Sequence, residues 1–296
     1  AGMTQTPRFL RSALFVPAAN GRALARSADF DADALIFDLE DSAAPEEKAE
    51  ARERLRDHLA TPRGSAMRVV RINPLATPEG TEDLLMARGA HADAILVPKV
   101  DRAADLLEVS AALEQTDAPP ALQVWAMVET PLGILNAGAI AAVRMAYPLG
   151  ALIAGPNDIV AAGRLRPSAG RPELIPWLAQ IVLAARAYGI PVLDGVYNDF
   201  RDAEGFAAEC AAGRRMGFDG KTLIHPSQVE RANAAFGPTA EEVEAARDIV
   251  AAFDDPANSG RGVIGIGGRM VERLHLADAR RLIDIAESIP NPKDRS

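Results

Sequence analysis

The sequence predicts an α/β protein whose core is a (β/α)8 barrel, and three observations support this fold class. Eight short, continuously apolar segments recur between residues 13 and 223, a pattern typical of strands buried on both faces in a parallel sheet. Alanine-rich segments with helical periodicity separate them, as in 46–59 and 177–188, and such segments form helices readily. Eight strand–helix units in roughly 230 residues match the size of such a barrel. An open, doubly wound sheet is the alternative, because sequence periodicity does not reveal whether a sheet closes.

The predicted strands, in chain order, cover residues 13–17, 34–38, 68–72, 94–98, 122–128, 151–154, 191–194 and 220–223. Each is followed by polar or charged residues and then by a segment suited to a helix. Parallel strands need crossover connections of this kind. We therefore expect each strand to lead to the next through a helix.

The C-terminal part of the chain departs from this pattern. Thr239 and Glu242 have the spacing of a capping box, which marks the start of a helix. The expected elements are a helix, a polar loop, a short strand and a second helix, over residues 239–253, 254–262, 263–266 and 277–289. We expect a catalytic barrel domain of residues 8–236 and a C-terminal extension of residues 237–296, which serves as a lid or an oligomerisation arm.

The composition narrows the function classes. The chain has 296 residues, of which 48% are hydrophobic and 25% charged, and this excludes a disordered chain and a disulfide-stapled miniprotein. Its formal net charge is −9, and no basic stripe interleaves with aromatics, so nucleic acid is not an expected partner. The sequence contains no run of 18 apolar residues, so a membrane-spanning helix is not expected. The single cysteine, Cys210, cannot form an intramolecular disulfide, which is typical of a reducing compartment, and we expect a cytoplasmic protein.

Chemically capable side chains gather at the ends of the predicted strands. They occur in Asp38-Leu-Glu-Asp41, Arg71-Ile-Asn73, Lys99, Glu129-Thr130 and Asn157-Asp158. Any one of these could be a helix N-cap or a solvated charge. Ligands of parallel α/β folds bind at the carboxyl ends of the strands. A closed barrel would direct all of these groups into one mouth.

Glu129 and Asp158 are the candidate metal ligands. They are 29 residues apart, one strand–helix unit, so they are expected on adjacent strand ends. Two close carboxylates repel each other unless a cation lies between them. Oxygen ligands favour Mg²⁺, with Mn²⁺ as the alternative. The four histidines lack the spacing of zinc ligands.

Arg71 is the candidate clamp for a substrate carboxylate or enolate oxygen, because a guanidinium binds such groups through two atoms. An ion pair with the acids of the preceding strand end is the alternative. Asp38, Glu40 and Asp41 exceed what a two-ligand metal site needs, so we expect some to orient Arg71 or hold metal-bound water, and others to cap the next helix. Cys210 has no histidine nearby in the sequence and is expected to be a buried structural thiol.

Several segments together resemble the citrate lyase β-subunit-like family within the HpcH/HpaI aldolase superfamily. The matching segments are Arg11-Ser-Ala-Leu-Phe-Val-Pro17, Asp38-Leu-Glu-Asp41, Pro45-Glu-Glu-Lys48 with Ala51-Arg52, Val70-Arg71-Ile-Asn73, Val97-Pro-Lys99, Met127-Val-Glu129-Thr130 and Gly217-Phe-Asp-Gly-Lys-Thr-Leu-Ile-His-Pro-Ser-Gln-Val229. They span most of the chain in the family's order. Each segment is weak evidence by itself, but their combination is specific to the family.

The resemblance implies a TIM barrel with a C-terminal lid and a Mg²⁺-dependent lyase. Its substrate would be a β-hydroxyacyl-CoA of the malyl-CoA or citramalyl-CoA type, cleaved to or formed from an acyl-CoA enolate and an α-keto acid. Glu129 and Asp158 correspond to the metal ligands, and Arg71 to the substrate clamp. The resemblance also places three cations at the mouth, where they would meet the phosphates of coenzyme A: Arg11, Arg22 and Lys99. A lid that serves a neighbouring subunit implies a homotrimer or hexamer.

Two departures from the family pattern affect the expected activity. In similar active lyases a Gly-x-Met-Ile/Val-Asp-x-Pro segment in the lid supplies an acid/base Asp to the neighbouring subunit. Here Glu272 stands at the Asp position and Leu274 at the Pro position. Glu272 is therefore the candidate acid/base, and a solvated charge is the alternative. Asn157 stands where similar citrate lyase-like chains commonly have Glu.

Three other functions stay open at this point. The protein could be an aldolase acting on a free hydroxy-keto acid, or an acyl-CoA thioesterase that passes the acyl group to water. It could also be a non-catalytic acyl-CoA-binding subunit of a larger lyase complex, which the altered lid segment favours. The acidic pair argues against the non-catalytic role, since an unneeded pair of like charges costs stability.

Overall fold

The computed structural model describes residues 9–289, which form two compact units that we treat separately. The first comprises Leu10–Phe236, and the second begins at Gly237. The strands of the first unit are β1 (Ser12–Pro17), β2 (Ala34–Asp38), β3 (Met67–Arg71), β4 (Ala94–Val97), β5 (Gln123–Val128), β6 (Leu149–Ala154), β7 (Val192–Asp194) and β8 (Gly220–Leu223). Each lies within about two residues of a predicted strand.

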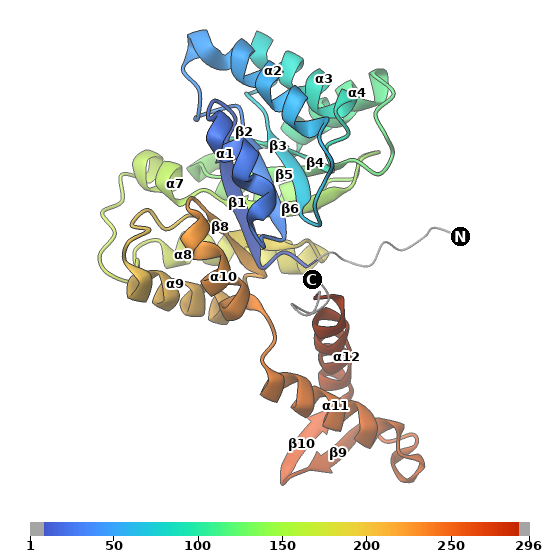
Figure 1. The fold of residues 1–296 in the computed structure, drawn as a ribbon. Helices are drawn as coiled ribbons and strands as arrows, with labels where there is room; N and C mark the ends of the chain where they lie inside the picture. Colours follow the sequence, from blue (N-terminus) through green and yellow to red (C-terminus); the bar gives the residue numbers. More distant parts are fainter. Residues whose placement is uncertain (1–8, 290–296) are drawn as a thin grey trace. The chain divides into compact units, whose positions relative to one another are not determined.

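These eight strands form a closed parallel barrel, which confirms the predicted fold class and excludes the open sheet (Figure 1). Every strand pairs in parallel with its neighbour in the chain, from β1 with β2 to β7 with β8. The barrel closes where β1 pairs with β8, with Ser12 opposite Lys221 and Leu14 opposite Leu223. All carboxyl ends therefore meet at one rim, which is where a (β/α)8 barrel carries its site.

The continuous apolar character of the strands follows from burial on both faces. Ile36 belongs to the cluster inside the barrel, whereas the next residue, Phe37, packs in the layer between the barrel and the helices. Both side chains have no solvent exposure. Because neighbouring residues of a strand point to opposite faces, both kinds of position must be apolar.

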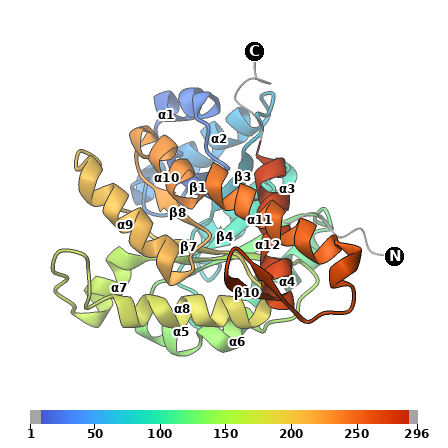
Figure 2. The same ribbon diagram turned by 90° about the horizontal axis from the view of Figure 1, so that it is seen from below.

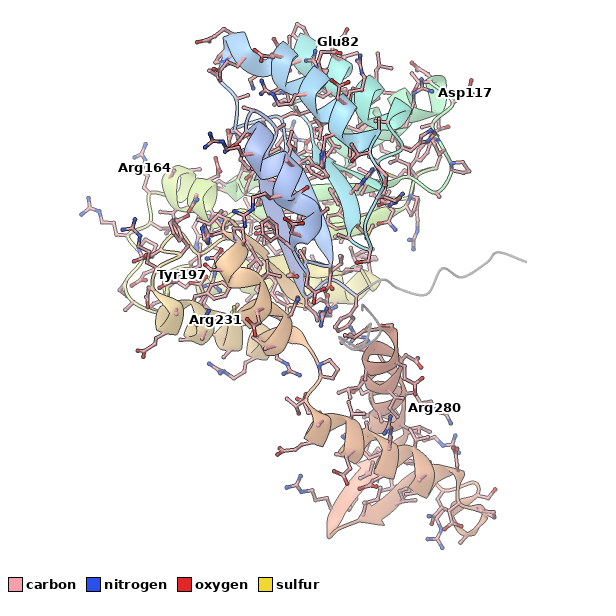
Figure 3. All side chains as sticks on the ribbon, viewed as in Figure 1. Glu82, Asp117, Arg164, Tyr197, Arg231 and Arg280 are labelled. Carbon is pink, nitrogen blue, oxygen red and sulfur yellow. The ribbon has the colours of Figure 1, made fainter. Side chains whose placement is uncertain are left out.

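The helices of the first unit surround the barrel (Figure 2). They are α1 (Gly21–Arg26), α2 (Lys48–Leu59), α3 (Pro78–Gly89), α4 (Ala103–Gln115), α5 (Pro131–Leu135), α6 (Ala137–Ala141), α7 (Pro156–Gly163), α8 (Ile175–Tyr188), α9 (Ala203–Met216) and α10 (Val229–Phe236). Charged side chains such as Glu82 and Arg164 are exposed on this outer layer (Figure 3). Within residues 9–289, no helix combines the length and apolar character that crossing a bilayer requires.

The second unit contains α11 (Ala240–Asp254), β9 (Val263–Ile266), β10 (Arg269–Glu272) and α12 (Arg273–Ser288). The capping box of Thr239 and Glu242 is present, with reciprocal hydrogen bonds of 3.1 and 2.8 Å. The sequence analysis placed the last helix at 277–289 and missed β10. The helix begins four residues earlier, and β10 pairs antiparallel with β9. Gly267 and Gly268, both with positive φ, form the two-residue turn between these strands.

Candidate active site

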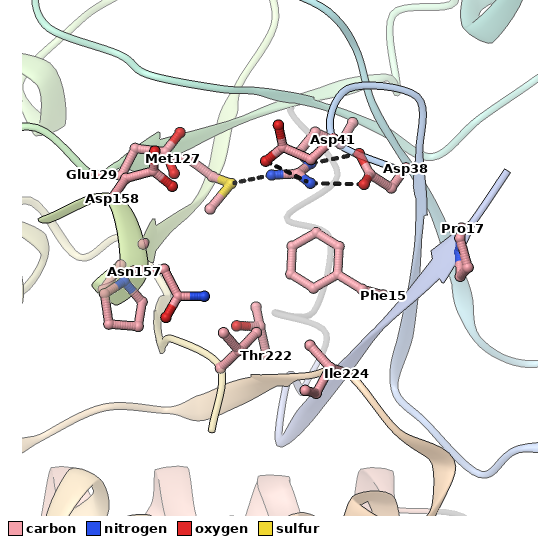
Figure 4. A pocket seen from close by; sticks show the side chains of 15 residues that line it. Phe15, Pro17, Asp38, Asp41, Met127, Glu129, Asn157, Asp158, Thr222 and Ile224 are labelled. Atoms are coloured by element: carbon pink, nitrogen blue, oxygen red, sulfur yellow. Dashed lines mark hydrogen bonds and ion pairs between the residues drawn. The ribbon is translucent and has the colours of Figure 1, made fainter. Parts of the chain in front are cut away.

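A cavity of about 270 Å³ opens at the carboxyl-end rim of the barrel. Its lining comes from the ends of seven strands and the loops after them: Phe15, Pro17, Asp38, Asp41, Arg71, Met127, Glu129, Ala154, Gly155, Pro156, Asn157, Asp158, Val196, Thr222 and Ile224. Figure 4 shows Glu129 and Asp158 on one side of this pocket and Asp38 and Asp41 on the other. The fold thus brings Asp41, Arg71, Glu129 and Asp158 into one cavity together with Asp38, whereas the other residues predicted for catalysis or coenzyme A binding do not line it.

Glu129 is the most deeply buried acid of the pocket. It follows β5 directly, and only 1% of it is exposed. Burial raises the pKa of Glu129 to about 7; a hydrogen bond from the Lys99 backbone N–H lowers it, and the charges of Asp158 and Glu40 raise it further. Asp158 lies half-buried in the first turn of α7 and lines the same pocket. The two predicted metal ligands are therefore close enough to repel each other electrostatically.

This pair fits a divalent cation. A cation between the two carboxylates would offset both the repulsion and the burial of Glu129. Among residues 9–289, no cluster of three or more His, Cys, Asp or Glu side chains is arranged to hold a metal. Two carboxylate ligands suit Mg²⁺, which usually takes one or two carboxylates and fills its other positions with water and substrate oxygens.

Arg71 ends β3 and is held by acids from the end of β2. Its Nε and Nη2 atoms donate to the two carboxylate oxygens of Asp38, each at 2.7 Å (Figure 4). Its Nη1 lies 3.0 Å from Glu40 Oε2, and its Nη2 lies 3.6 Å from Asp41 Oδ2. Burial by itself lowers the pKa of Arg71, but these hydrogen bonds and charges raise it overall. The ion pair with the strand-end acids, which was the alternative to the clamp role, is present, and Arg71 also lines the pocket.

Glu40 lies behind the pocket lining, between two cations. Its Oε1 accepts a hydrogen bond of 3.1 Å from Lys99 Nζ, while its buried Oε2 accepts none. Burial raises the pKa of Glu40, and the charge of Arg71 opposes this effect. Lys99 is half-exposed, and its backbone N–H donates to Glu129 Oε1 at 2.7 Å. Lys99 therefore contacts both a predicted metal ligand and an acid of the Arg71 cluster.

Arg11 does not lie at the mouth, so that expectation is wrong. It precedes β1 and therefore lies at the opposite, amino-end rim of the barrel. There its guanidinium pairs with Asp33 at 2.8 and 3.0 Å. Arg22, in contrast, is exposed on α1 after the carboxyl end of β1. It lines a shallow groove that shares Pro17 with the main pocket.

Glu272 belongs to the second unit, where it ends β10 and precedes α12. Its side chain is exposed, and its backbone N–H donates to His275 Nδ1 at 2.9 Å. Asn157 lines the barrel pocket and forms a reciprocal pair of amide hydrogen bonds with Asn198, at 3.2 and 2.8 Å.

Sequence reasoning missed the apolar part of the pocket and the dominant role of Asp38 in holding Arg71. The Phe15 ring lies under the guanidinium of Arg71, 4.9 Å from its central carbon, and Met127 Sδ lies 3.8 Å from Arg71 Nη1. Both apolar residues occupy strand positions near the carboxyl end. Their position near the strand ends could have identified them as candidates. It does not distinguish residues that line the pocket from residues of the hydrophobic core.

The fold and the pocket define a (β/α)8-barrel protein with an acidic, arginine-containing cavity at the carboxyl-end rim. Residues 11–226 match the HpcH/HpaI aldolase/citrate lyase family, and the chain belongs to this family.

Full-length relatives support this assignment. The chain is 46% identical over 283 residues to a (3S)-malyl-CoA thioesterase of Cereibacter sphaeroides, covering 94% of this chain and 95% of the relative. It is 36% identical over 286 residues to citrate lyase subunit beta of Escherichia coli, covering 95% of this chain and 94% of that relative. The structure of the CitE protein of Mycobacterium tuberculosis in complex with magnesium, acetoacetate and coenzyme A is similar, with 31% identity and a TM-score of 0.74, covering 96% of this chain and 99% of that one. These similarities support an enzyme of the lyase type.

Proposed function

We propose that the protein is a Mg²⁺-dependent carbon–carbon lyase that acts on a β-hydroxyacyl-CoA of the malyl-CoA or citramalyl-CoA type. The observation that carries the proposal is the buried Glu129 beside Asp158, in a pocket that also contains the Arg71 guanidinium. The similar CitE structure, which holds magnesium, acetoacetate and coenzyme A, supports the cofactor and the substrate class.

Glu129 and Asp158 would hold the ion. Bound there, Mg²⁺ supplies Lewis-acid polarisation of a substrate carbonyl and carboxylate. Arg71 offsets the negative charge that develops on a substrate oxygen, and such preorganised charges contribute several kcal/mol to lowering a barrier. Asp38 fixes Arg71 through two atoms, so little reorganisation is needed when the charge appears. Glu40 and Asp41 complete the acidic shell that orients Arg71.

The reaction needs one proton removed and one returned. A base takes the proton of the substrate hydroxyl, and the bond between the carbinol carbon and the adjacent methylene carbon breaks. Its electron pair forms the thioester enolate, and the oxygen left behind becomes the carbonyl of an α-keto acid. Protonation of the enolate carbon gives the acyl-CoA. We assign the acid/base role to Glu272 of the C-terminal extension, supplied by a neighbouring subunit in a homotrimer or hexamer.

Two cations on the pocket rim are the proposed contacts for the phosphates of coenzyme A. Arg22 is exposed beside a groove adjoining the pocket, and the half-exposed ammonium of Lys99 lies on the same rim. Both present a positive charge next to an otherwise acidic cavity, which suits a polyanionic cosubstrate.

Thioester hydrolysis is the second candidate, and a specific observation favours it. The relative with 46% identity along almost the whole chain is a (3S)-malyl-CoA thioesterase. In this reaction water attacks the thioester carbonyl, the C–S bond breaks, and the products are malate and coenzyme A with a free thiol.

Product analysis separates the two reactions. Purified protein is incubated with malyl-CoA and Mg²⁺, and glyoxylate, acetyl-CoA and free thiol are measured in parallel. A lyase releases glyoxylate and acetyl-CoA in equal amounts without free thiol, whereas a thioesterase releases free thiol and malate. Glu129→Gln serves as the control for non-enzymatic decay. If neither malyl-CoA nor citramalyl-CoA is consumed, the proposed function is wrong.

A further inference from the structure

The carboxylate of Glu129 is held by main-chain atoms from the two neighbouring strand ends. On one side, the backbone N–H of Lys99 donates to Glu129 Oε1 at 2.7 Å. Lys99 has a φ of 49°, in the left-handed region that side-chain-bearing residues seldom adopt. The following residue is anchored too, since Val100 N–H donates to Met127 O at 3.0 Å. The turn after β4 thus adopts an unfavourable conformation at the residue whose N–H reaches Glu129.

On the other side, Glu129 lies directly against Gly155. A Cβ atom at Gly155 would lie 2.5 Å from both Cβ and Oε2 of Glu129, and 3.3 Å from its Cδ. These are the three nearest atoms, and all belong to Glu129. The Gly155 backbone cannot easily retreat, because its N–H donates to Val128 O at 3.2 Å. Only glycine lets the two chain segments approach this closely.

We propose that the main chain at Lys99 and Gly155 forms a cradle that fixes the orientation of the Glu129 carboxylate for a divalent cation. Both are positioning residues, and Lys99 acts through its N–H rather than its ammonium. This inference rests on the proposed function for the identity of the ion. Groups that orient a metal ligand typically change metal affinity by about 10–100-fold when they are altered.

Mg²⁺ titration calorimetry of the purified protein tests the cradle without measuring turnover. Gly155→Ala should weaken Mg²⁺ binding by about 10-fold or more. Gly138→Ala is the matched control, because a Cβ at Gly138 in α6 meets no atom within 4 Å, and it should bind Mg²⁺ like the unmodified protein. Lys99→Gly and Lys99→Ala both lack the ammonium and keep the N–H, but only glycine adopts positive φ without strain, so Lys99→Gly should bind Mg²⁺ more tightly than Lys99→Ala. Normal Mg²⁺ binding by Gly155→Ala would overturn the role of Gly155. Mg²⁺ binding by Lys99→Gly that is no tighter than that of Lys99→Ala would overturn the role of the Lys99 main chain.

A thermal-melting cycle in the absence of metal tests the close approach by itself. Gly155→Ala should lower Tm strongly in the unmodified protein and much less in a Glu129→Gly background, where the clashing atoms are gone. If Gly155→Ala prevents folding of the otherwise unmodified protein but not of the Glu129→Gly variant, that result would support the cradle equally. Equal effects in both backgrounds, or failure to fold in both, would contradict it. Absence of Mg²⁺ binding by the unmodified protein would instead count against the proposed function, and the melting cycle would still decide whether Gly155 and Glu129 approach as closely as described.

Discussion

Lys221 and Asp194 form an ion pair that is closed off from solvent. Lys221 Nζ lies 2.9 Å from Asp194 Oδ2, and both side chains are 0% exposed. Glu209 and Arg171 complete the network: Lys221 Nζ donates to Glu209 Oε1 at 2.7 Å, and Arg171 Nη1 donates to Asp194 Oδ1 at 2.9 Å. Two positive and two negative charges therefore balance among β7, β8, α9 and the segment before α8 that carries Arg171. The residue after Lys221, Thr222, lines the pocket, so the network also supports the pocket wall.

Removing one charge from this network should destabilise the barrel severely. Lys221→Met keeps the apolar part of the side chain but leaves Asp194 and Glu209 with less compensation. Breaking a buried pair by removing one partner typically costs about 3–5 kcal/mol. We expect a loss of about 3 kcal/mol in the free energy of unfolding, measured by urea denaturation, because Arg171 still partly compensates Asp194.

The control is an ion pair at the surface. Arg56 and Glu53 on α2 pair at 2.7 Å, with more than half of each side chain exposed. Arg56→Gln should change the free energy of unfolding by less than about 1 kcal/mol. Equal losses for Lys221→Met and Arg56→Gln would show that the buried network does not contribute as described.

Stability should fall in acid partly through Asp194. Burial by itself raises the pKa of this carboxyl, but Lys221 and Arg171 overcome that effect and lower it overall. The unfolded chain therefore binds a proton at a higher pH than the folded protein, so protons favour unfolding. Asp194 contributes fully to the stability of the folded protein above its pKa in the unfolded chain, about 4. This stabilisation is lost as the pH falls through the lower pKa that Asp194 has in the folded protein.

Urea denaturation at a series of pH values from neutrality downward measures this effect. Asp194→Asn removes the titrating group, so its free energy of unfolding should change less between neutral and acidic pH than that of the unmodified protein. Parallel pH profiles for the two proteins would be inconsistent with a lowered pKa of Asp194.

Cys210 should be chemically inert in the folded protein. It is buried on α9, where burial raises its pKa to about 12; the charge of Lys221 opposes this shift, and the charges of Asp194 and Glu209 add to it. The thiol is therefore protonated and inaccessible at neutral pH, whereas the thiolate is the reactive form. Mass spectrometry after iodoacetamide treatment should show no alkylation of native protein and complete alkylation in denaturant. Rapid labelling of the native protein would contradict this prediction.

The proposed role of Arg71 predicts a large effect of a conservative change. Arg71→Lys keeps one positive charge, but an ammonium cannot bond Asp38 through two parallel N–H groups and still place a third nitrogen beside Glu40. We expect kcat/KM with malyl-CoA to fall about 100-fold, the cost typical of a misplaced catalytic group. Urea denaturation of the same variant checks that the fold persists. Unchanged kcat/KM would exclude Arg71 from the reaction.

The barrel fold could be predicted from the sequence because several independent features point to it. Most strand positions are apolar on both faces, eight strand–helix units match the size of a (β/α)8 barrel, and the family resemblance favoured the closed barrel over an open sheet. The position of a cation relative to its strand also predicts its rim: Arg71 ends β3, while Arg11 precedes β1. The expectation for Arg11 failed because it came from a motif resemblance rather than from this position.

Other features depend on geometry that sequence does not encode locally. Asp38, Glu40 and Asp41 lie within four residues, yet Asp38 holds Arg71, Glu40 is buried behind the pocket and Asp41 is largely exposed. Which acid takes which place depends on the turn after β2. The hairpin of β9 and β10 did have a local signal, the Gly267-Gly268 pair between two short apolar segments.

Glu272 provides the last test, because its proposed role crosses a subunit boundary. Glu272→Gln removes the proton-transfer group from an exposed side chain, so folding and Mg²⁺ affinity should be unchanged. The turnover number should fall by about 100-fold or more, as expected when a general acid/base is lost. Glu129→Gln should inactivate the barrel site instead. If the lid of one subunit serves the next, mixed oligomers of these two inactive variants contain some sites with both residues intact. Unfolding and refolding the two together should then restore part of the activity, whereas no recovery in verified mixed oligomers would place the acid/base within the same subunit or exclude Glu272.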